Sequence, residues 1–518
     1  MITPASDAPF RTLPDLIGEH ARLRPDHPAL RDEHDTLSYA ELDALMDRIA
    51  AALQRDGVQP GQAIAICAGA SVRYAALFMG ALRAGAVVAP LAPSSTAEAL
   101  ALMLRDAEAR LLFVDAGTAE RLPAPDPALP RIALDGSAGG RAWGDWLAPA
   151  GARPQPVAIA PDAPFNIIYS SGTTGTPKGI VQSHGMRWSH IQRGSVYDYG
   201  PQGSTLLATP LYSNTTLVVF VPTLAYGGCV VLMPKFDALH YLQLAQQHRI
   251  THTMLVPVQY QRIMALPQFG QFDLGAFRDK FCTSAPFRAE LKADVLARWP
   301  GGLVEFYGMT EGGGTCILDA HLHPTKLHTV GRPAATSDIR LIDEDGHEVA
   351  PFDAGEVVGH SPGMMTGYHG QPAKTREAEW FDATGKRFIR TGDVGRFDAD
   401  GFLTLIDRRK DMIISGGFNI YPSDLEAALR QHPAVHDVAV VGVPSEQWGE
   451  TPVAFVVPNT GATATAGELK DWYNQRAGKT QRLSDLRLVD ALPRSAIGKV
   501  LKRELREAYA VGEPRSPS

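Results

Sequence analysis

The stretch that decides the fold is Phe165-Asn-Ile-Ile-Tyr-Ser-Ser-Gly-Thr-Thr-Gly-Thr-Pro-Lys-Gly179. Its first five residues are mostly apolar and predict a short buried strand. Residues 170–179 then combine three glycines, several hydroxyl side chains and one lysine. Glycine lets backbone N–H groups turn toward an anion, hydroxyls add neutral donors, and Lys178 adds a positive charge. We therefore expect a polyphosphate-binding loop at the carboxyl end of a strand.

The loop does not have the Walker pattern. That pattern requires Gly-Lys-Ser or Gly-Lys-Thr, whereas Lys178 lies between Pro177 and Gly179. A cluster of Ser, Thr and Gly is also typical of a solvated connector, so the loop alone leaves both interpretations open. The candidate phosphate ligands are Ser171, Gly172, Thr173, Thr174, Gly175 and Lys178.

Size and composition indicate a globular protein of more than one domain. A chain of 518 residues exceeds what one hydrophobic core usually serves. The net charge of -7 provides no general attraction for nucleic acid or membranes, and the four cysteines show no metal or redox spacing. The N-terminus lacks an export signal, and the apolar stretch 217–233 is interrupted by Pro222 and by two glycines. We expect a cytoplasmic protein without membrane insertion.

The first part of the chain alternates between helical and strand patterns. Apolar residues at helical spacing over 42–53 end at Gly57, and residues 63–67 then have a strand pattern. Helical patterns recur at 72–84 and 96–107, with strand patterns at 87–89 and 111–114, whereas 116–164 is predicted to be mostly surface loop. The stretch 217–233 predicts a core helix followed by a strand. This order predicts an α/β fold with layered subdomains and mostly parallel sheets.

A smaller α+β domain is predicted from about residue 411 to 505. Ser423 and Glu426 have capping-box spacing at the start of a helix that turns Leu425, Ala428 and Leu429 inward. Strand patterns follow at 438–441 and 453–457, and the tail 512–518 is expected to be disordered. The charge run at 407–411 is, by itself, typical of a solvated turn.

Motifs spread over residues 165–503 resemble those of the adenylate-forming superfamily, which includes acyl-CoA and aryl-CoA synthetases, nonribosomal adenylation domains and firefly luciferase. After the loop at 169–179 they are Tyr307-Gly-Met-Thr-Glu311, Val330-Gly-Arg-Pro333, Arg390-Thr-Gly-Asp393, Asp407-Arg-Arg-Lys-Asp411, Gly416-Gly417 with Tyr421-Pro422, and Pro493-Arg-Ser-Ala-Ile-Gly-Lys499. The resemblance implies a large domain over 1–406 and a small mobile domain over 407–518, with a hinge at 407–411.

The same resemblance assigns nucleotide contacts. It implies that Glu311 holds Mg²⁺, that Thr310 contacts the α-phosphate, and that Tyr307 stacks on adenine. The opposite face of the base would be lined by Ser284, Ala285 and Pro286, with Gly308 nearby. Without the motif, a Thr-Glu pair is more typical of a helix N-terminus, and a lone tyrosine is as typical of a core.

Three further residues belong to the implied active site. Asp393 would accept hydrogen bonds from both ribose hydroxyls, with Arg408 adding a contact. Lys499, in the loop 493–499, would bridge the carboxylate and the α-phosphate during adenylation. Taken alone, Arg390-Thr-Gly-Asp393 indicates a tight turn, and Lys499 a solvated loop charge.

The second half-reaction implied by the resemblance is thioester formation after a domain rotation about Lys410. Gly416 and Gly417 would let a pantetheine arm pass close to the backbone. Trp448 and Arg482 match positions that hold the nucleotide end of CoA in some aryl-CoA ligases. A half-buried tryptophan and a surface arginine are equally good interpretations of these two residues.

The predicted acid pocket departs from the pattern of many CoA ligases. Ser213-Asn-Thr-Thr216 follows Pro210-Leu-Tyr212 where those enzymes have a histidine, and Ser94 follows Ala92-Pro93 where some have a basic residue. The polar side chains favour a substituted aromatic acid, with a medium-chain acid as the alternative. The pocket is predicted to comprise Ser213, Asn214, Thr215, Gly308 and Gly313.

The prediction is therefore an AMP-forming carboxylic acid:CoA ligase that uses ATP, Mg²⁺ and coenzyme A. Two alternatives stay open: a freestanding adenylation enzyme that loads a carrier protein, and a nucleotide-binding protein without turnover. The expected partners are a small carboxylic acid, ATP and CoA, and a homodimer is left open.

Overall fold

The structure is a computed structural model that describes residues 8–122, 126–170, 178–408, 411–415, 418–445, 448–478, 481–495, 498–510 and 512. Most of the predicted phosphate loop (171–177), the predicted hinge residue Lys410, Gly416 and Gly417, and nearly all of the predicted disordered tail lie outside these residues. The chain forms two compact units. One comprises 1–339 with 359–389, and the other 340–358 with 390–518.

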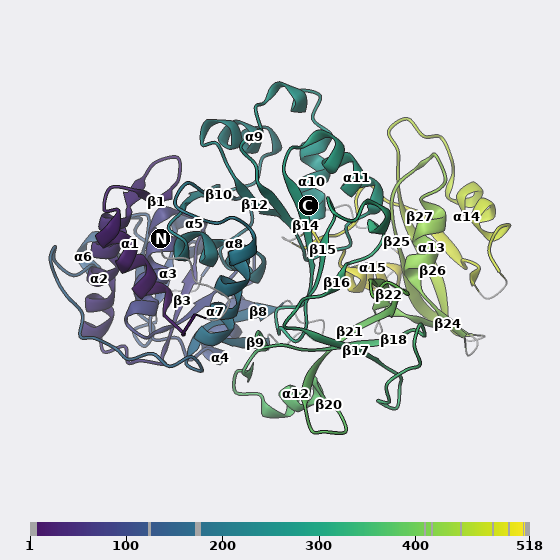
Figure 1. Cartoon of the computed structure of the whole chain (residues 1–518). Helices are drawn as coiled ribbons and strands as arrows, with labels where there is room; N and C mark the ends of the chain where they lie inside the picture. Colours follow the sequence, from purple (N-terminus) through teal and green to yellow (C-terminus); the bar gives the residue numbers. More distant parts are fainter. Residues whose placement is uncertain are drawn as a thin grey trace. The chain divides into compact units, whose positions relative to one another are not determined.

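The first sheet of unit 1 contains nine strands among the described residues (Figure 1). In spatial order they are β16 (Arg332–Pro333), β15 (Cys316–Asp319), β14 (Gly302–Tyr307), β13 (Asp279–Cys282), β12 (His252–Leu255), β10 (Ser204–Leu207), β11 (Cys229–Leu232), β1 (Pro28–Arg31) and β2 (Thr36–Ser38). The central run from β14 to β1 is parallel. Parallel strands are buried on both faces, and even the polar residues Thr205, His252 and Lys280 of this run are buried.

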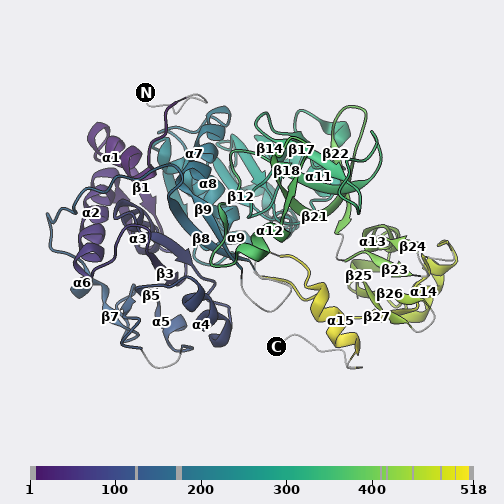
Figure 2. The same cartoon turned by 90° about the horizontal axis from the view of Figure 1, so that it is seen from below.

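The second sheet of unit 1 holds the strand predicted at 165–169. Its described strands are, in order, β19 (Gly367–Tyr368), β9 (Lys178–Ser183), β8 (Pro164–Ser170), β4 (Val87–Pro90), β3 (Ala63–Cys67), β5 (Leu112–Val114), β6 (Arg131–Ala133) and β7 (Arg141–Ala142). Alternate residues of β3 enter different cores: Ile64 and Ile66 pack on one face, Ala65 and Cys67 on the other. Figure 2 shows helices on both sides of this sheet.

The helices of unit 1 fill the space around these sheets. They are α1 (Leu13–Leu23), α2 (Tyr39–Arg55), α3 (Val72–Arg83), α4 (Ala97–Asp106), α5 (Ala116–Ala119), α6 (Trp143–Trp146), α7 (His184–Arg193), α8 (Asn214–Ala225), α9 (Ala238–Gln247), α10 (Pro257–Met264), α11 (Ala289–Arg298) and α12 (Pro372–Glu377). The main core joins residues of α1, α2, α3, α7 and α8 to both sheets. A layered α/β unit results, as the sequence predicted.

A third sheet has the order β17 (Asp338–Ile342), β18 (Gly355–His360), β21 (Arg387–Phe397) and β20 (Glu379–Phe381), and β22 (Leu403–Arg408) also pairs with β21. The division between the two units falls within β17, β18 and β21. The sequence pattern did not predict this sheet.

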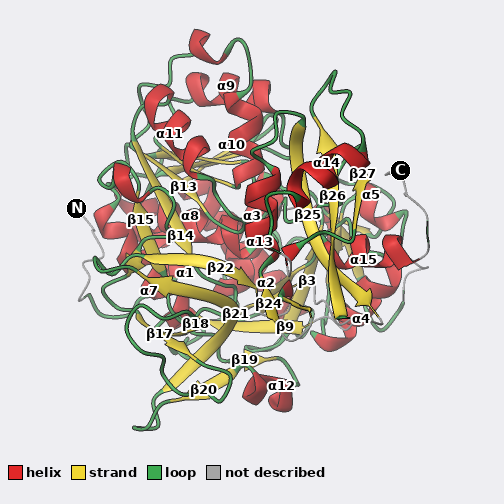
Figure 3. Cartoon of the chain, turned by 90° about the vertical axis from the view of Figure 1, so that its right-hand side faces the viewer, coloured by secondary structure: helices red, strands yellow, loops and turns green. Residues whose placement is uncertain are grey.

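The C-terminal part of unit 2 is a sheet with helices on both faces (Figure 3). Its described strands are β24 (Phe418–Ile420), β23 (Ile413–Ser415), β26 (Gly449–Pro458), β25 (Val435–Ser445) and β27 (Asp485–Leu488), and its helices are α13 (Pro422–Leu429), α14 (Ala466–Asn474) and α15 (Lys502–Ala510). Val438 and Val440 pack with α13 and α14, whereas Val441 and Val443 pack with Leu505 of α15. This confirms the predicted α+β character.

The capping box predicted at Ser423 and Glu426 is wrong. Helix α13 begins at Pro422, so Ser423 lies inside the first turn. Its backbone N–H donates to Oδ2 of Asp407 at 2.9 Å, and its hydroxyl donates to the carbonyl of Ile406. A side chain sixteen residues earlier therefore caps this helix, which no local pattern can indicate. Leu425 and Leu429 are buried, as predicted.

The helix and strand predicted over 217–233 are α8 and β11, with Pro222 inside the helix. No described helix is long and apolar enough to cross a membrane.

Candidate active site

The predicted adenine-binding and acid-binding segments of unit 1 leave the same edge of the first sheet. Strands β10, β12, β13 and β14 run parallel, and the segments 213–215, 284–286 and 308–311 follow the carboxyl ends of β10, β13 and β14. Open α/β sheets bind ligands at this edge because the connecting loops gather there. The structure thus brings together segments that are about a hundred residues apart in sequence.

The predicted phosphate loop connects two paired strands. Strands β8 and β9 are antiparallel, and Ser170 at the end of β8 lies opposite Lys178 at the start of β9. Lys178 is partly exposed and lies on the side of the hairpin where β19 pairs with β9.

Lys178 and Glu311 meet through Tyr368. The Nζ atom of Lys178 lies 5.1 Å from the centroid of the Tyr368 ring, a cation–π distance. The hydroxyl of Tyr368 donates to Oε1 of Glu311 at 2.9 Å. Burial, and then the charge and hydrogen bond of Glu311, raise the pKa of Tyr368, so the phenol stays protonated and remains a donor. Sequence reasoning missed Tyr368, since a single tyrosine in a short strand has no distinguishing spacing.

A second link joins Thr310 to Asn214. The side-chain amide of Gln182, in β9, donates to the carbonyl of Thr310 at 2.7 Å and to Oδ1 of Asn214 at 3.3 Å. The backbone of the neighbouring Glu311 is also fixed, because its carbonyl accepts the N–H of Met365 at 2.7 Å. The predicted α-phosphate contact and the predicted acid pocket therefore share one amide group.

Two other predicted pocket residues, Ser213 and Thr215, flank Asn214 at the start of α8. Ser213 is the N-cap of α8, and its hydroxyl accepts the N–H of Thr215 at 3.3 Å. The hydroxyl of Thr215 lies 2.6 Å from that of Ser284, so the acid segment contacts the predicted adenine segment. Ser284 has a φ of 82°, a strained conformation for a residue other than glycine. Tyr307 is buried at the end of β14.

The glycines after Glu311 serve close packing. A Cβ on Gly312 would overlap the carbonyl oxygen of Gly363, and a Cβ on Gly313 would lie 2.9 Å from that of Gly359. Both glycines have positive φ, 77° and 81°. At Gly308, by contrast, the nearest atom would be 3.6 Å away. The acid-pocket role of Gly313 stays a prediction.

Unit 2 contains the predicted ribose contacts. Asp393 of β21 lies opposite Arg408 of β22 in the antiparallel register. The N–H of Asp393 donates to Oγ1 of Thr391 at 3.0 Å, and that hydroxyl donates to the carbonyl of Val357 at 2.8 Å. Arg390 forms an ion pair with Glu356. The turn expected at Arg390-Thr-Gly-Asp393 is instead part of a continuous strand.

Lys499 lies at a tight reversal of the chain in unit 2. The N–H of Ser495 donates to the carbonyl of Lys499 at 2.8 Å, and the N–H of Lys499 donates to Oγ of Ser495 at 3.2 Å. Gly498 has a φ of 76°, which such a reversal requires. Trp448 and Arg482, the predicted CoA contacts, are exposed.

The residues of unit 1 fit a bound magnesium ion. The described residues bring together no group of three or more His, Cys, Asp or Glu side chains. Mg²⁺ is commonly held by one or two carboxylates together with substrate phosphates and water. Glu311, fixed beside Lys178 by Tyr368, suits that arrangement.

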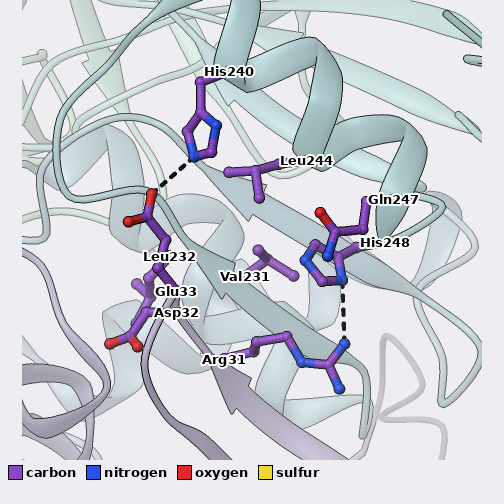
Figure 4. A pocket seen from close by; sticks show the side chains of 9 residues that line it. All are labelled: Arg31, Asp32, Glu33, Val231, Leu232, His240, Leu244, Gln247 and His248. Carbon is purple, nitrogen blue, oxygen red and sulfur yellow. Dashed lines mark hydrogen bonds and ion pairs between the residues drawn. The ribbon is translucent and has the colours of Figure 1, made fainter.

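A hollow of about 410 Å³ elsewhere in unit 1 contains none of the predicted site residues (Figure 4). Its charged groups bind one another: Nε2 of His240 lies 2.8 Å from Oε1 of Glu33, and Arg31 donates to Nδ1 of His248 at 3.1 Å. The exposed contact between His240 and Glu33 is typical of a protein surface.

Loops at the carboxyl ends of parallel strands in the first sheet, a fixed carboxylate on one of them and a lysine on a hairpin of the second sheet are together typical of a nucleotide-binding enzyme of the α/β class. The model of the AMP-binding enzyme family matches residues 17–369, and that of the AMP-binding enzyme C-terminal domain matches 424–499. The chain belongs to the AMP-binding enzyme family.

Several relatives are acid–CoA ligases. A feruloyl-CoA synthase of an Amycolatopsis species is 34% identical over 94% of this chain and 97% of its own length. An indoleacetate–CoA ligase of Aromatoleum aromaticum is 33% identical over 96% of this chain and 98% of its own length. The structure of o-succinylbenzoate CoA synthetase from Bacillus subtilis with its acyl-adenylate intermediate has a TM-score of 0.82, with 26% identity over 96% of this chain and 99% of that one.

The protein is an ATP-dependent carboxylic acid:CoA ligase of the AMP-forming type that uses ATP, Mg²⁺ and coenzyme A. This confirms the predicted enzyme class and the predicted fold.

Proposed function

We propose that the ligase activates an aromatic carboxylic acid of moderate size. The acid's carboxylate attacks the α-phosphate of ATP, which gives acyl-adenylate and pyrophosphate, and the thiol of CoA then displaces AMP to form the thioester. The observation that carries the proposal is the contact of Lys178 and Tyr368 with Glu311, whose neighbour Thr310 is linked to Asn214 through the amide of Gln182. The polar residues Ser213, Asn214 and Thr215, and relatives named for feruloyl and indoleacetate substrates, support an aromatic acid.

In this proposal the residues of unit 1 bind the triphosphate and the base. Lys178 offsets phosphate charge, Thr310 contacts the α-phosphate, and the loop residues 171–175 donate to the phosphates. Glu311 holds Mg²⁺, which neutralises charge on the phosphate oxygens when bound. Tyr307 stacks on adenine, and 284–286 line its other face. The protonated Tyr368 keeps the Glu311 carboxylate oriented.

The residues of unit 2 act on the ribose and on the two half-reactions. Asp393 accepts from the ribose hydroxyls with help from Arg408, and the register of β21 and β22 supports this pairing. Lys499 stabilises the adenylating transition state. A rotation about Lys410, at a boundary after residue 406, then replaces Lys499 by the CoA-binding residues Gly416, Gly417, Trp448 and Arg482.

The proposal also includes a cytoplasmic location and a homodimer. Light scattering on the purified protein measures its molar mass in solution and so tests the homodimer. The mass of a single chain would exclude it.

A panel of acids tests the function. Cinnamate, ferulate, indole-3-acetate and octanoate are each assayed for pyrophosphate release with and without CoA, and for thioester by mass spectrometry. We expect the highest kcat/KM with an aromatic acid and thioester only when CoA is present. A preference for octanoate overturns the aromatic assignment. Adenylate without thioester would indicate a carrier protein as acceptor.

A further inference from the structure

Asp106, the last residue of α4, is a charged side chain that the proposed chemistry does not use. It is half-buried, and it forms no ion pair with any residue that the structure describes. A carboxylate in the last turn of a helix faces the negative end of the helix dipole, which is unfavourable. Hydrogen-bond donors from other segments must offset that cost, and two of them belong to the neighbourhood of the nucleotide site.

The first donor is Tyr169, in the strand β8 that leads into the predicted phosphate loop. Its hydroxyl donates to Oδ2 of Asp106 at 2.7 Å, and the carbonyl of Met103 lies 3.0 Å from the same hydroxyl. Burial, and then the hydrogen bond and charge of Asp106, raise the pKa of Tyr169, so the phenol remains a donor. In the register of the hairpin Tyr169 lies opposite Gly179, the residue after Lys178. The carboxylate therefore fixes the β8 side of the hairpin to α4.

The carboxylate also lies close to the other strand of the hairpin. A Cβ on Gly179 would lie 2.8 Å from Oδ2 of Asp106 and 2.8 Å from Cγ2 of Ile167, so a larger residue would displace the carboxylate. The carbonyl of Gly179 accepts the N–H of His369, just after β19, at 2.7 Å. The residue that follows Lys178 is thus held by close contact with Asp106 and by a hydrogen bond from the β19 segment.

The second donor is Gln371, which follows β19. Its side-chain amide donates to Oδ1 of Asp106 at 3.2 Å, and its backbone N–H donates to the carbonyl of Tyr368 at 3.1 Å. Tyr368 in turn donates to Glu311, and its ring faces Lys178. The two oxygens of one carboxylate thus join the strand before the phosphate loop to the segment that carries Tyr368.

We propose that Asp106 is a positioning residue for the triphosphate of ATP, because it fixes Lys178 and the Tyr368–Glu311 pair relative to each other. The inference rests on the proposed function, in which Lys178 offsets phosphate charge and Glu311 holds Mg²⁺. Both groups act on the charge of the triphosphate, whereas other residues bind adenine and ribose. Small displacements of such groups weaken their effect on a bound ligand. Loss of Asp106 should therefore weaken the binding of ATP much more than that of AMP.

Substitutions at both ends of the contact test the proposal. Asp106→Ala and Tyr169→Phe should each raise the KM for ATP about tenfold and leave the KM for the acid within about twofold of wild type. The double variant should be little worse than Asp106→Ala alone, since the two groups act through one contact. Asp106→Asn keeps an oxygen for Tyr169, and its NH₂ group can donate to Oε1 of Gln371 once that amide turns over. It should recover most of the affinity for ATP.

Calorimetric titration with a non-hydrolysable ATP analogue and Mg²⁺, and separately with AMP, measures binding without turnover. In Asp106→Ala the Kd of the analogue should rise about tenfold, and the Kd of AMP should stay within about twofold of wild type. The matched control is Tyr39→Phe, which removes another tyrosine hydroxyl, one that donates to the carbonyls of Leu224 and Gly228. This control should lower the melting temperature and leave both Kd values unchanged.

A purely structural role of Asp106 predicts that Asp106→Ala behaves like the control, and that result overturns the proposal. An equal rise in both Kd values also overturns it, because the effect would then not concern the triphosphate. So does an Asp106→Asn variant that binds the analogue as weakly as Asp106→Ala, since both hydrogen bonds can persist in it. If wild-type enzyme releases no pyrophosphate with any acid, the proposed function itself fails, and that result is visible without any variant.

Discussion

Tyr368 is the residue through which Glu311 and Lys178 contact each other in unit 1. Its ring faces the lysine and its hydroxyl donates to the carboxylate. Tyr368→Phe keeps the ring and removes the hydroxyl. Since a net hydrogen bond to a charged group contributes about 1.5–3 kcal/mol, we expect kcat/KM for ATP to fall about tenfold to a hundredfold.

The measurement is pyrophosphate release as a function of Mg²⁺ concentration. The variant should need more Mg²⁺ for half-maximal activity, because a freely rotating Glu311 holds the ion less well. An unchanged Mg²⁺ dependence would show that Tyr368 does not orient Glu311. Phe388→Leu is the control, because the Phe388 ring packs against Trp380. This variant should have a lower melting temperature and an unchanged Mg²⁺ dependence.

Asp393 allows a prediction on nucleotide choice. If its carboxylate accepts from both ribose hydroxyls, dATP loses one charge-assisted hydrogen bond, which costs about 1.5–3 kcal/mol, or about tenfold to a hundredfold in kcat/KM. Steady-state kinetics with both nucleotides measures the ratio. In Asp393→Ala, kcat/KM should be nearly the same for ATP and dATP. Equal kcat/KM for the two nucleotides in the wild type would remove Asp393 from this role.

At the scale of elements, the turn after Glu311 depends on its glycines. Gly312 has a φ of 77°, and a Cβ there would overlap the backbone of Gly363. Gly312→Ala should destabilise unit 1 by about 2–3 kcal/mol, because both the φ strain and the overlap must be relieved. It should also lower activity, since Glu311 is adjacent. Chemical denaturation checks the first effect, and Gly308→Ala, which has room for a Cβ, is the control for stability.

Sequence reasoning succeeded where an element is defined by its own residues. The helix α2 and the strand β3 have regular apolar spacing, and their burial matches it. It failed where a contact with a segment distant in sequence determines the local structure. The cap of α13 comes from Asp407, the contact of Gly312 is the backbone of Gly363, and Tyr368 meets Glu311 and Lys178 only because folding brings them together. The individual motifs predicted the site residues, but they did not reveal the amide of Gln182 that links Thr310 to Asn214.

At the scale of the whole molecule, the proposed contacts are divided between the two units. Lys178, Tyr307 and Glu311 belong to unit 1, whereas Asp393, Arg408 and Lys499 belong to unit 2. The proposed hinge at Lys410 lies within unit 2, after Asp393 and before Lys499, so a rotation there would exchange Lys499 while the ribose contact of Asp393 is kept. Adenylation and thioester formation should then respond differently to a change in unit 2.

Lys499 gives the sharpest test of that expectation, because it should act in only one of the two half-reactions. During adenylation its ammonium offsets the charge that develops as the carboxylate oxygen approaches the α-phosphate, and losing such a transition-state interaction costs about a hundredfold to a thousandfold in rate. Lys499→Ala should therefore slow acid-dependent pyrophosphate release by at least that factor. The same variant, given synthetic acyl-adenylate and CoA, should form thioester at close to the wild-type rate.

Arg494→Ala is a suitable control for the loop that carries Lys499. Arg494 donates to the carbonyl of Gly498 at 2.6 Å and forms an ion pair with Asp437, so its loss loosens the loop without removing the ammonium. We expect a smaller loss of adenylation than in Lys499→Ala and no effect on the thioester step. If Lys499→Ala adenylates normally, the lysine is an ordinary loop charge. If it slows both steps equally, the half-reactions are not separated by an exchange at Lys499, and the proposed rotation about Lys410 is wrong.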